Sequence, residues 1–152
     1  MKRFITLVLA SLMLFSFVSC NKKNEGTIPY TLIISCDEIL ANIDSDTYAI
    51  KEEKKEIVPE DGMILKMDAN CSEEDNAFDI VVESLKEKKI HFEGTDGYFK
   101  GISNIYEGDC GQYSGWMFFV NGNLAETGAS DTYIKDNDII EFKYVVDYNT
   151  LF

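Results

Sequence analysis

The chain has little histidine and few basic residues, and both shortages narrow its chemistry. His91 is the one histidine among 152 residues, so His-rich metal sites and an H-E-x-x-H metalloprotease helix are excluded. Its 14 Lys and Arg are outnumbered by 27 Asp and Glu, which gives a formal net charge of −13 at pH 7. So acidic a surface repels phosphates, and nucleic acid is therefore not expected as a partner.

The usual signatures of catalysis are missing as well. No C-x-x-C pair and no glycine-rich phosphate loop occur, and Ser114 in G-Q-Y-S-G (residues 111–115) does not form a G-x-S-x-G elbow. We interpret His91 as a partly buried strand residue, not as a general base. The acid pair Asp136/Asp138 lacks the spacing of a calcium-binding EF-hand loop. We therefore expect a protein that is not an enzyme, and we assign no metal ligands.

The N-terminus carries the strongest targeting signal. A basic start precedes an apolar run over residues 4–18, which is followed by Ser19 and Cys20. The run has the length of a secretory h-region and is too short for a confident transmembrane span. A small residue directly before a cysteine is typical of bacterial lipoproteins, although Phe17 stands where leucine is usual. We expect residues 1–19 to be a lipoprotein signal peptide and Cys20 to carry the lipid; an ordinary signal peptide is the alternative.

This interpretation sets the organisation of the mature chain. Removing residues 1–19 leaves 133 residues, enough for one domain with a core, and the loss of Lys2 and Arg3 takes the net charge from −13 to −15. Residues 20–29 are expected to be a polar tether and residues 30–152 a single domain. The protein would be held at the extracytoplasmic face of the cell membrane by lipid, not by a basic patch.

One amphipathic helix is predicted among short strands. Ser72 resembles an N-cap, and Phe78, Val81, Val82 and Leu85 follow on one helical face. Strands are expected over residues 30–35, 63–67, 90–92, 98–105, 116–120 and 140–144. Tight turns are expected at residues 121–122 and 136–138. Between the first two strands we expect a short helical turn over residues 37–43 and a solvated arm around residues 51–56. An α+β fold, a β-grasp-like mixed sheet with one packed helix, accounts for this order.

The segment over residues 106–120 is the best candidate for a binding site. Its glycines flank an aromatic loop that leads into the single tryptophan. Glycine lets the backbone approach a partner closely, and aromatic rings offer a flat ligand a stacking surface. We therefore predict a ligand-binding edge made by Tyr113, Ser114, Gly115 and Trp116, with Ser114 as a polar contact. The alternative for Trp116 is that it fills the core between sheet and helix.

Three stretches in the second half of the chain carry a recognisable pattern. They are S-G-W-M-F-F-V-N-G at residues 114–122, G-A-S at residues 128–130 and I-K-D-N-D-I-I-E-F-K-Y at residues 134–144. This pattern resembles the transcobalamin-like C-terminal domain family, and the resemblance covers residues 30–146. Two residues depart from the family pattern: Asn137 replaces the usual turn glycine, and Phe142 replaces the usual tryptophan.

The resemblance implies a β-grasp-like domain similar to the smaller domain of animal cobalamin carriers. There the domain covers one face of the corrinoid, and a larger helical domain, for which the mature chain has no room, covers the other. We therefore expect a ligand-binding domain with a cobalamin-type corrinoid as the leading ligand. Two alternatives stay open: a surface protein-interaction or adhesion module, and a cation-binding module.

The cysteines are Cys20, Cys36, Cys71 and Cys110. With Cys20 acylated, three remain in an oxidising compartment, which is enough for one bridge, and the residues alone do not choose the pair. Cys36 and Cys110 resemble family positions. The resemblance therefore implies a Cys36–Cys110 disulfide.

Overall fold

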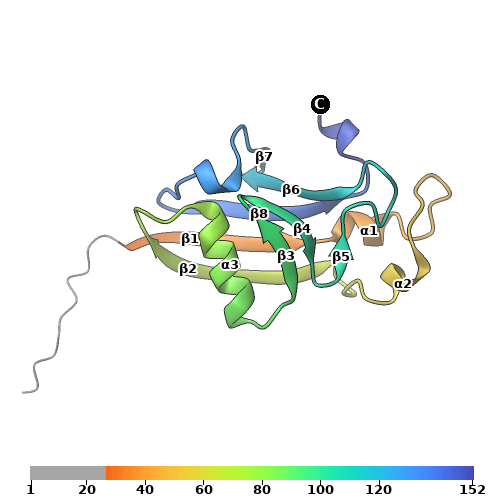
Figure 1. The fold of residues 1–152 in the computed structure, drawn as a ribbon, viewed down its shortest axis with the longest axis horizontal. Coiled ribbons are helices and arrows are strands. Elements are labelled where there is room, and N and C mark those ends of the chain that lie inside the picture. Colours follow the sequence, from red (N-terminus) through yellow and green to blue (C-terminus); the bar gives the residue numbers. More distant parts are fainter. Residues whose placement is uncertain (1–26) are drawn as a thin grey trace, which may run out of the picture.

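A five-stranded mixed sheet organises the computed structural model, which describes residues 27–152 (Figure 1). In spatial order its strands are β2 (Met63–Ser72), β1 (Thr27–Ser35), β8 (Asp138–Val145), β6 (Gly115–Val120) and β7 (Asn123–Leu124). The two central strands β1 and β8 run parallel, and the other neighbours are antiparallel. The predicted α+β class, a β-grasp-like mixed sheet with one packed helix, is confirmed.

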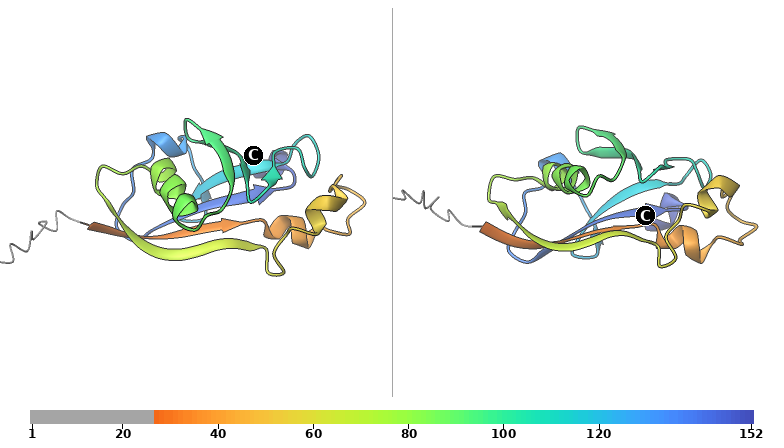
Figure 2. Two further views of the ribbon diagram at one scale, coloured as in Figure 1. Left: turned by 60° about the horizontal axis from the view of Figure 1, so that its bottom comes forward. Right: turned by 90° about the horizontal axis from the view of Figure 1, so that it is seen from below.

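A second layer covers one face of this sheet. It consists of α3 (Ala77–Glu87) and a separate small sheet of β3 (Phe92–Thr95), β4 (Tyr98–Ile102) and β5 (Ile105–Tyr106), as Figure 2 shows. The ring of Phe99 in β4 lies 4.9 Å from that of Phe78 in α3 and 4.9 Å from that of Phe142 in β8, between centroids. Helix and both sheets therefore share one core. The sequence predicted these strands without separating them into two sheets.

Two one-turn helices connect β1 to β2. The predicted turn after β1 is α1 (Asp37–Ala41), and the predicted arm contains α2 (Glu52–Lys55), none of whose residues is buried. Two 3₁₀ turns, η1 (Ala129–Asp131) and η2 (Tyr148–Leu151), precede and follow β8.

The helix α3 begins later than the sequence predicted. Ser72 is still the last residue of β2, because β2 pairs with β1 along its whole length up to Thr27↔Ser72. The N-cap is Asn76, whose side-chain oxygen accepts the amide of Asp79 at 2.9 Å. Of the predicted face, Val81 and Leu85 are buried, whereas Phe78 and Val82 are only partly buried; Ala77, Ile80 and Ser84 complete the inner face.

The predicted tight turns are confirmed by the backbone. Asn121 and Gly122 have φ values of 53° and 77°, the left-handed pair that a two-residue hairpin requires, and they join β6 to β7. Asn137, in the turn before β8, also has a positive φ of 63°. Asparagine tolerates this conformation better than most residues, so it suits this turn.

The first strand starts inside the predicted tether. β1 begins at Thr27 and pairs from there with β2, so residues 27–29 belong to the sheet. The predicted signal peptide and Cys20 lie outside the described residues. Among residues 27–152, no helix is both long enough and apolar enough to cross a membrane.

Candidate functional site

Ser114, predicted as a polar ligand contact, is the buried centre of the loop between β5 and β6. It is 2% exposed. Its hydroxyl donates to the carbonyl of Gly111 (2.8 Å), accepts the amide of Cys110 (3.0 Å) and lies 2.9 Å from the hydroxyl of Tyr144. The Tyr144 hydroxyl also donates to the carbonyl of Tyr106 at 2.7 Å. The Ser114 hydroxyl is therefore committed to protein partners, and these bonds give the loop a fixed shape.

Trp116 belongs to the core, which was the alternative considered for it. It is 3% exposed, and its indole N–H donates to the carbonyl of Ile105 at 2.9 Å. Its ring meets that of Tyr144 edge-on, with centroids 5.4 Å apart and planes at 80°. A buried indole with its N–H bonded is a typical core arrangement. The flat face of Trp116 is therefore not presented to solvent.

Tyr113 is exposed, as a binding residue should be, but it faces a different hollow. It is 45% exposed and packs edge-on against Tyr148, with ring centroids 5.8 Å apart. Together with Tyr48 and Asp147 it lines a hollow of about 220 Å³. Trp116 does not line this hollow. The structure therefore does not bring the side chains of Tyr113 and Trp116 together as walls of one site.

A longer groove follows the outer edge of β6. Two neighbouring hollows of about 270 and 300 Å³ share Tyr98, Trp116 and Met117, and we call them together the β6 groove. The first hollow is also lined by Glu107, Gln112, Ser114, Gly115 and Tyr148, and the second by Phe118, Leu124 and Phe142. Its size and its mixture of apolar walls with a few polar groups are those of small-ligand sites.

The backbone of Trp116 faces the β6 groove. The amide of Asn121 donates to the carbonyl of Ile139 in β8 (2.9 Å), and the amide of Ala125 donates to the carbonyl of Phe118 on the other side (3.0 Å). Alternate residues of a strand present their N–H and C=O groups to opposite sides, so Trp116 presents them to the same side as Phe118. β7 pairs with only the last two residues of β6. None of the described strands therefore pairs with Trp116 on this side, although the residue as a whole is only 3% exposed.

A tyrosine–carboxylate pair sets the electrostatics of the groove. Tyr98 is 47% exposed and donates its hydroxyl hydrogen bond to the carboxylate of Glu107. Burial, the bond to Glu107 and the charge of that carboxylate raise the pKa of Tyr98 to about 12. Tyr98 is therefore neutral at physiological pH and Glu107 supplies a negative charge. This combination favours ligands that carry N–H or O–H donors over ligands that carry carboxylates or phosphates.

Sequence reasoning missed most residues of this groove, Tyr98, Glu107 and Met117 among them. Tyr98 follows the turn residue Gly97, and an aromatic side chain at the tip of a hairpin was a usable signal for an exposed contact. Met117 alternates with Trp116 along a predicted strand, so one of the two had to face away from the core. Their meeting in one groove depends on how β4 packs beside β6.

The predicted Cys36–Cys110 disulfide is not present in the structure. Cys36, Cys71 and Cys110 are buried free thiols. Burial raises the pKa of Cys36 to about 12 and that of Cys110 to about 11, and the Cys110 charge adds to the effect on Cys36. Both thiols are therefore protonated at neutral pH in the folded protein.

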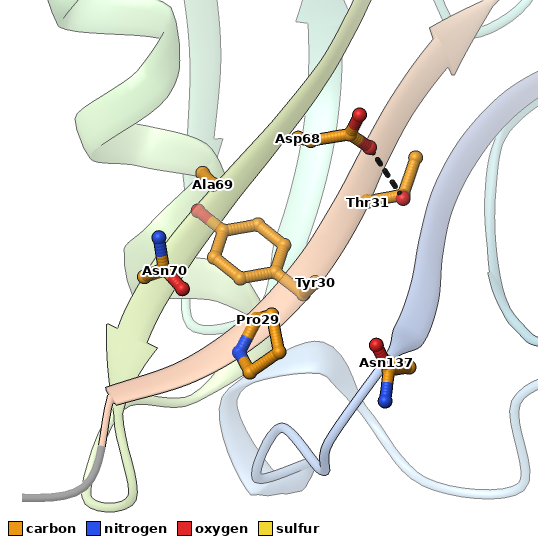
Figure 3. A pocket seen from close by; sticks show the side chains of 7 residues that line it. All are labelled: Pro29, Tyr30, Thr31, Asp68, Ala69, Asn70 and Asn137. Carbon is orange, nitrogen blue, oxygen red and sulfur yellow. Dashed lines mark hydrogen bonds between the residues drawn. The ribbon is translucent and has the colours of Figure 1, made fainter.

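A separate hollow of about 270 Å³ lies over β1 and β2 and has polar walls (Figure 3). Asp68, Asn70 and Asn137 line it, and Asp68 already accepts the hydroxyl of Thr31 at 2.7 Å. No group of three or more His, Cys, Asp or Glu side chains is placed to hold a metal ion anywhere in residues 27–152.

The segment from the approach to α3 to the end of β8 contains every lining residue of the β6 groove except Tyr148. Residues 74–145 match the DUF4430 family model, described as a domain of unknown function. No curated protein matches the chain.

Solved structures similar to this chain include two of interest. Haptocorrin in complex with Cbi is similar with a TM-score of 0.55 and 9% identity, over 80% of this chain and 25% of the haptocorrin chain. A protein from Ruminococcus gnavus ATCC 29149, for which metal binding has been suggested, has a TM-score of 0.43 and 13% identity, over 78% of this chain and 96% of its own. The haptocorrin similarity shows a shared fold, and this chain corresponds to a quarter of that protein.

Proposed function

We propose that this protein is a non-enzymatic, lipid-anchored binding domain on the extracytoplasmic face of the membrane, and that the β6 groove holds one face of a flat ligand. A cobalamin-type corrinoid is the ligand we favour. One observation carries the proposal: apolar walls meet, in a single groove, the side of Trp116 that β7 leaves without a strand partner.

The chemistry of the groove supports this ligand class. Met117, Phe118 and Leu124 offer apolar contact to a ring system. Glu107 and the Trp116 backbone offer acceptors to the amide groups that surround a corrin ring. The fold similarity to haptocorrin, solved in complex with Cbi, agrees with this choice, as does the family resemblance of the sequence.

Binding, not catalysis, is also what the polar side chains of the loop favour. The Ser114 hydroxyl is held by Gly111 and Cys110 and is buried, so it is not placed to attack a substrate. His91 lies elsewhere, with its Nε2 3.2 Å from the hydroxyl of Tyr106. A nucleophile and a base in mutual contact are what acyl-transfer chemistry needs, and these two residues do not supply that arrangement.

The test is a titration of the purified protein with cobalamin and, separately, cobinamide. Trp116 is the one tryptophan in the chain, so its fluorescence reports on the groove, and calorimetry gives the affinity independently. Because one groove covers one face of the ligand, we expect weak binding unless a partner covers the other face. No heat and no fluorescence change at millimolar ligand would reject the corrinoid assignment.

Matched variants locate the site. Tyr98→Ala should weaken binding about fivefold, since one aromatic contact contributes on the order of 1 kcal/mol beyond buried area. Tyr133→Ala is the control, because Tyr133 is also exposed (59%, against 47% for Tyr98) but does not line the groove. Tyr113→Ala tests the sequence prediction separately: it should weaken binding only for a ligand that extends past Gln112 into the neighbouring hollow.

Membrane attachment is tested at Cys20. The wild-type protein should incorporate a fatty-acid analogue during growth, and Cys20→Ala should remove the label and release or misprocess the protein. A wild-type protein that takes up no label and whose mature N-terminus lies elsewhere would exclude the anchor.

An interaction module is the second function that a specific observation favours. The free strand edge at Trp116 can pair with the backbone of an extended peptide as well as with a small molecule. If corrinoids fail to bind and Tyr98→Ala still disrupts a protein complex at the cell surface, this second assignment replaces the first.

A further inference from the structure

A buried carboxylate holds the loop between β5 and β6 (residues 107–114) to the connection between β1 and β2 (residues 36–62), which is called the arm from here on. Asp109 is 2% exposed. One carboxylate oxygen accepts a hydrogen bond from Nζ of Lys51 at 2.6 Å, and the other oxygen lies 3.1 Å from Nζ of Lys54. The second oxygen also accepts the amide of Tyr106 at 2.7 Å. Burial alone would raise the pKa of Asp109, but these donors outweigh burial and lower it, so the carboxylate is charged at neutral pH.

Lys54 is the more enclosed of the two lysines. Its side chain is 13% exposed, compared with 50% for Lys51. Besides Asp109 it donates to the carbonyl of Asn104 at 2.7 Å, in the turn between β4 and β5, and its Nζ lies 5.4 Å from the ring centroid of Tyr106. A single side chain of the arm therefore contacts three points of the opposite segment.

The residues of α2 add little apolar packing, whereas Tyr48, Ile50 and Val58 on either side of it are partly buried against the core. No residue of α2 is buried, and the neighbouring backbone contributes one bond, from the amide of Lys51 to the carbonyl of Asp109 (3.1 Å). The arm nevertheless forms one wall of the hollow that Tyr113 lines, through Tyr48 and Ala49. That hollow therefore depends on the arm staying against the loop.

The same loop supplies a wall of the β6 groove, through Glu107, Gly108 and Gln112. We propose that Asp109, Lys51 and Lys54 are positioning residues: they clamp the arm to the loop, and the clamp gives the groove and the hollow beside Tyr113 their binding shape. The ligand part of this inference rests on the proposed function of the groove. The clamp itself is a property of the protein without ligand.

The first experiment measures the clamp alone, by amide hydrogen exchange of the full chain without ligand. Lys54→Met keeps the length of the side chain and removes its charge, and Lys54→Arg keeps the charge. We expect exchange over residues 106–115 to rise about tenfold or more in Lys54→Met and to stay near wild type in Lys54→Arg, because hydrogen bonds to charged groups are the stronger class. Lys55→Met is the matched control, since Lys55 forms its ion pair with Glu52 of its own helix and forms none with the loop among the described residues.

Unchanged exchange in Lys54→Met would overturn the clamp. A rise spread evenly over the whole chain would also overturn it, because it would indicate general loss of stability. If Lys54→Met fails to fold, Lys51→Met replaces it: Lys51 is half exposed, and losing its bond to Asp109 should still raise exchange over residues 106–115 selectively.

The second experiment adds cobalamin. Lys54→Met should weaken binding about as much as Tyr98→Ala does, and Lys54→Arg should restore it. If exchange rises but affinity does not fall, the clamp exists but does not position the site. If the wild-type protein binds no corrinoid while Lys54→Met still loosens the loop, the proposed function fails and the clamp stands.

Discussion

Removing the hydroxyl of Ser114 tests whether the loop before β6 is a hydrogen-bonded core or a ligand-facing surface. In Ser114→Ala, the amide of Cys110 and the carbonyl of Gly111 lose their side-chain partner. Cys110 is buried, so its amide is left without water as well. Tyr144 keeps a partner, because its hydroxyl also bonds the carbonyl of Tyr106.

The magnitude follows from these losses. A neutral hydrogen bond contributes about 1 kcal/mol net, and a buried group left unsatisfied costs about 1–3 kcal/mol. Two bonds are lost and one buried amide is orphaned, so we expect the free energy of unfolding to fall by about 2–4 kcal/mol in Ser114→Ala. A loss of this size is a substantial part of the stability of a domain, which is about 5–15 kcal/mol.

Urea unfolding followed by Trp116 fluorescence is the assay, because Trp116 packs beside this network. Ser72→Ala is the control: Ser72 is exposed, and this change should stay within about 0.5 kcal/mol. A Ser114→Ala protein as stable as the wild type would refute the structural reasoning and restore Ser114 as a surface contact.

A double-mutant cycle with Tyr144→Phe refines the test. The two hydroxyls lie 2.9 Å apart and share the same loop, so the double variant should lose less stability than the two single variants together. Strict additivity would show that the hydroxyls act independently.

Three further predictions concern other parts of the fold. Cys36 and Cys110 should resist alkylation at pH 8 in the folded protein and react once it unfolds, since burial raises the pKa of each thiol to about 12 and about 11; rapid reaction when folded, or a bridge found by mass spectrometry, would contradict this. Gly62→Ala should lower the melting temperature more than Gly122→Ala does. Both glycines have a positive φ, but an added Cβ at Gly62 would lie 2.5 Å from the backbone of α1, whereas a Cβ at Gly122 would meet no atom. The pKa of Asp109 is lower in the folded than in the unfolded protein, so its charge stabilises the fold above about pH 4, and this contribution is lost as the pH falls further. The difference in unfolding free energy between wild type and Asp109→Asn should therefore become smaller at acid pH. A difference that does not change with pH would be inconsistent with the ion pairs.

Several elements of this fold could be predicted from short-range patterns in the sequence alone. The spacing of apolar residues placed the helix α3 and part of its buried face, although its cap is Asn76, four residues beyond the predicted Ser72. Asn121-Gly122 specified a hairpin because few residue pairs adopt two successive positive φ angles. The alternation around Phe142 specified a strand, although Glu141, on the face opposite Phe142, is buried as well. Each signal depends on interactions within a few residues, which is why a single sequence suffices to predict it.

The binding site was decided by tertiary structure. Nothing local distinguishes Ser114 facing a ligand from Ser114 facing Tyr144, thirty positions along the chain. The groove forms because β4 brings Tyr98 beside Met117 of β6, and because β7 is too short to cover the backbone of Trp116. The sequence by itself determined which segment is aromatic, glycine-rich and structured. Only the packing of distant strands decided which of its atoms face solvent, because exposure is set by neighbours that local sequence does not name.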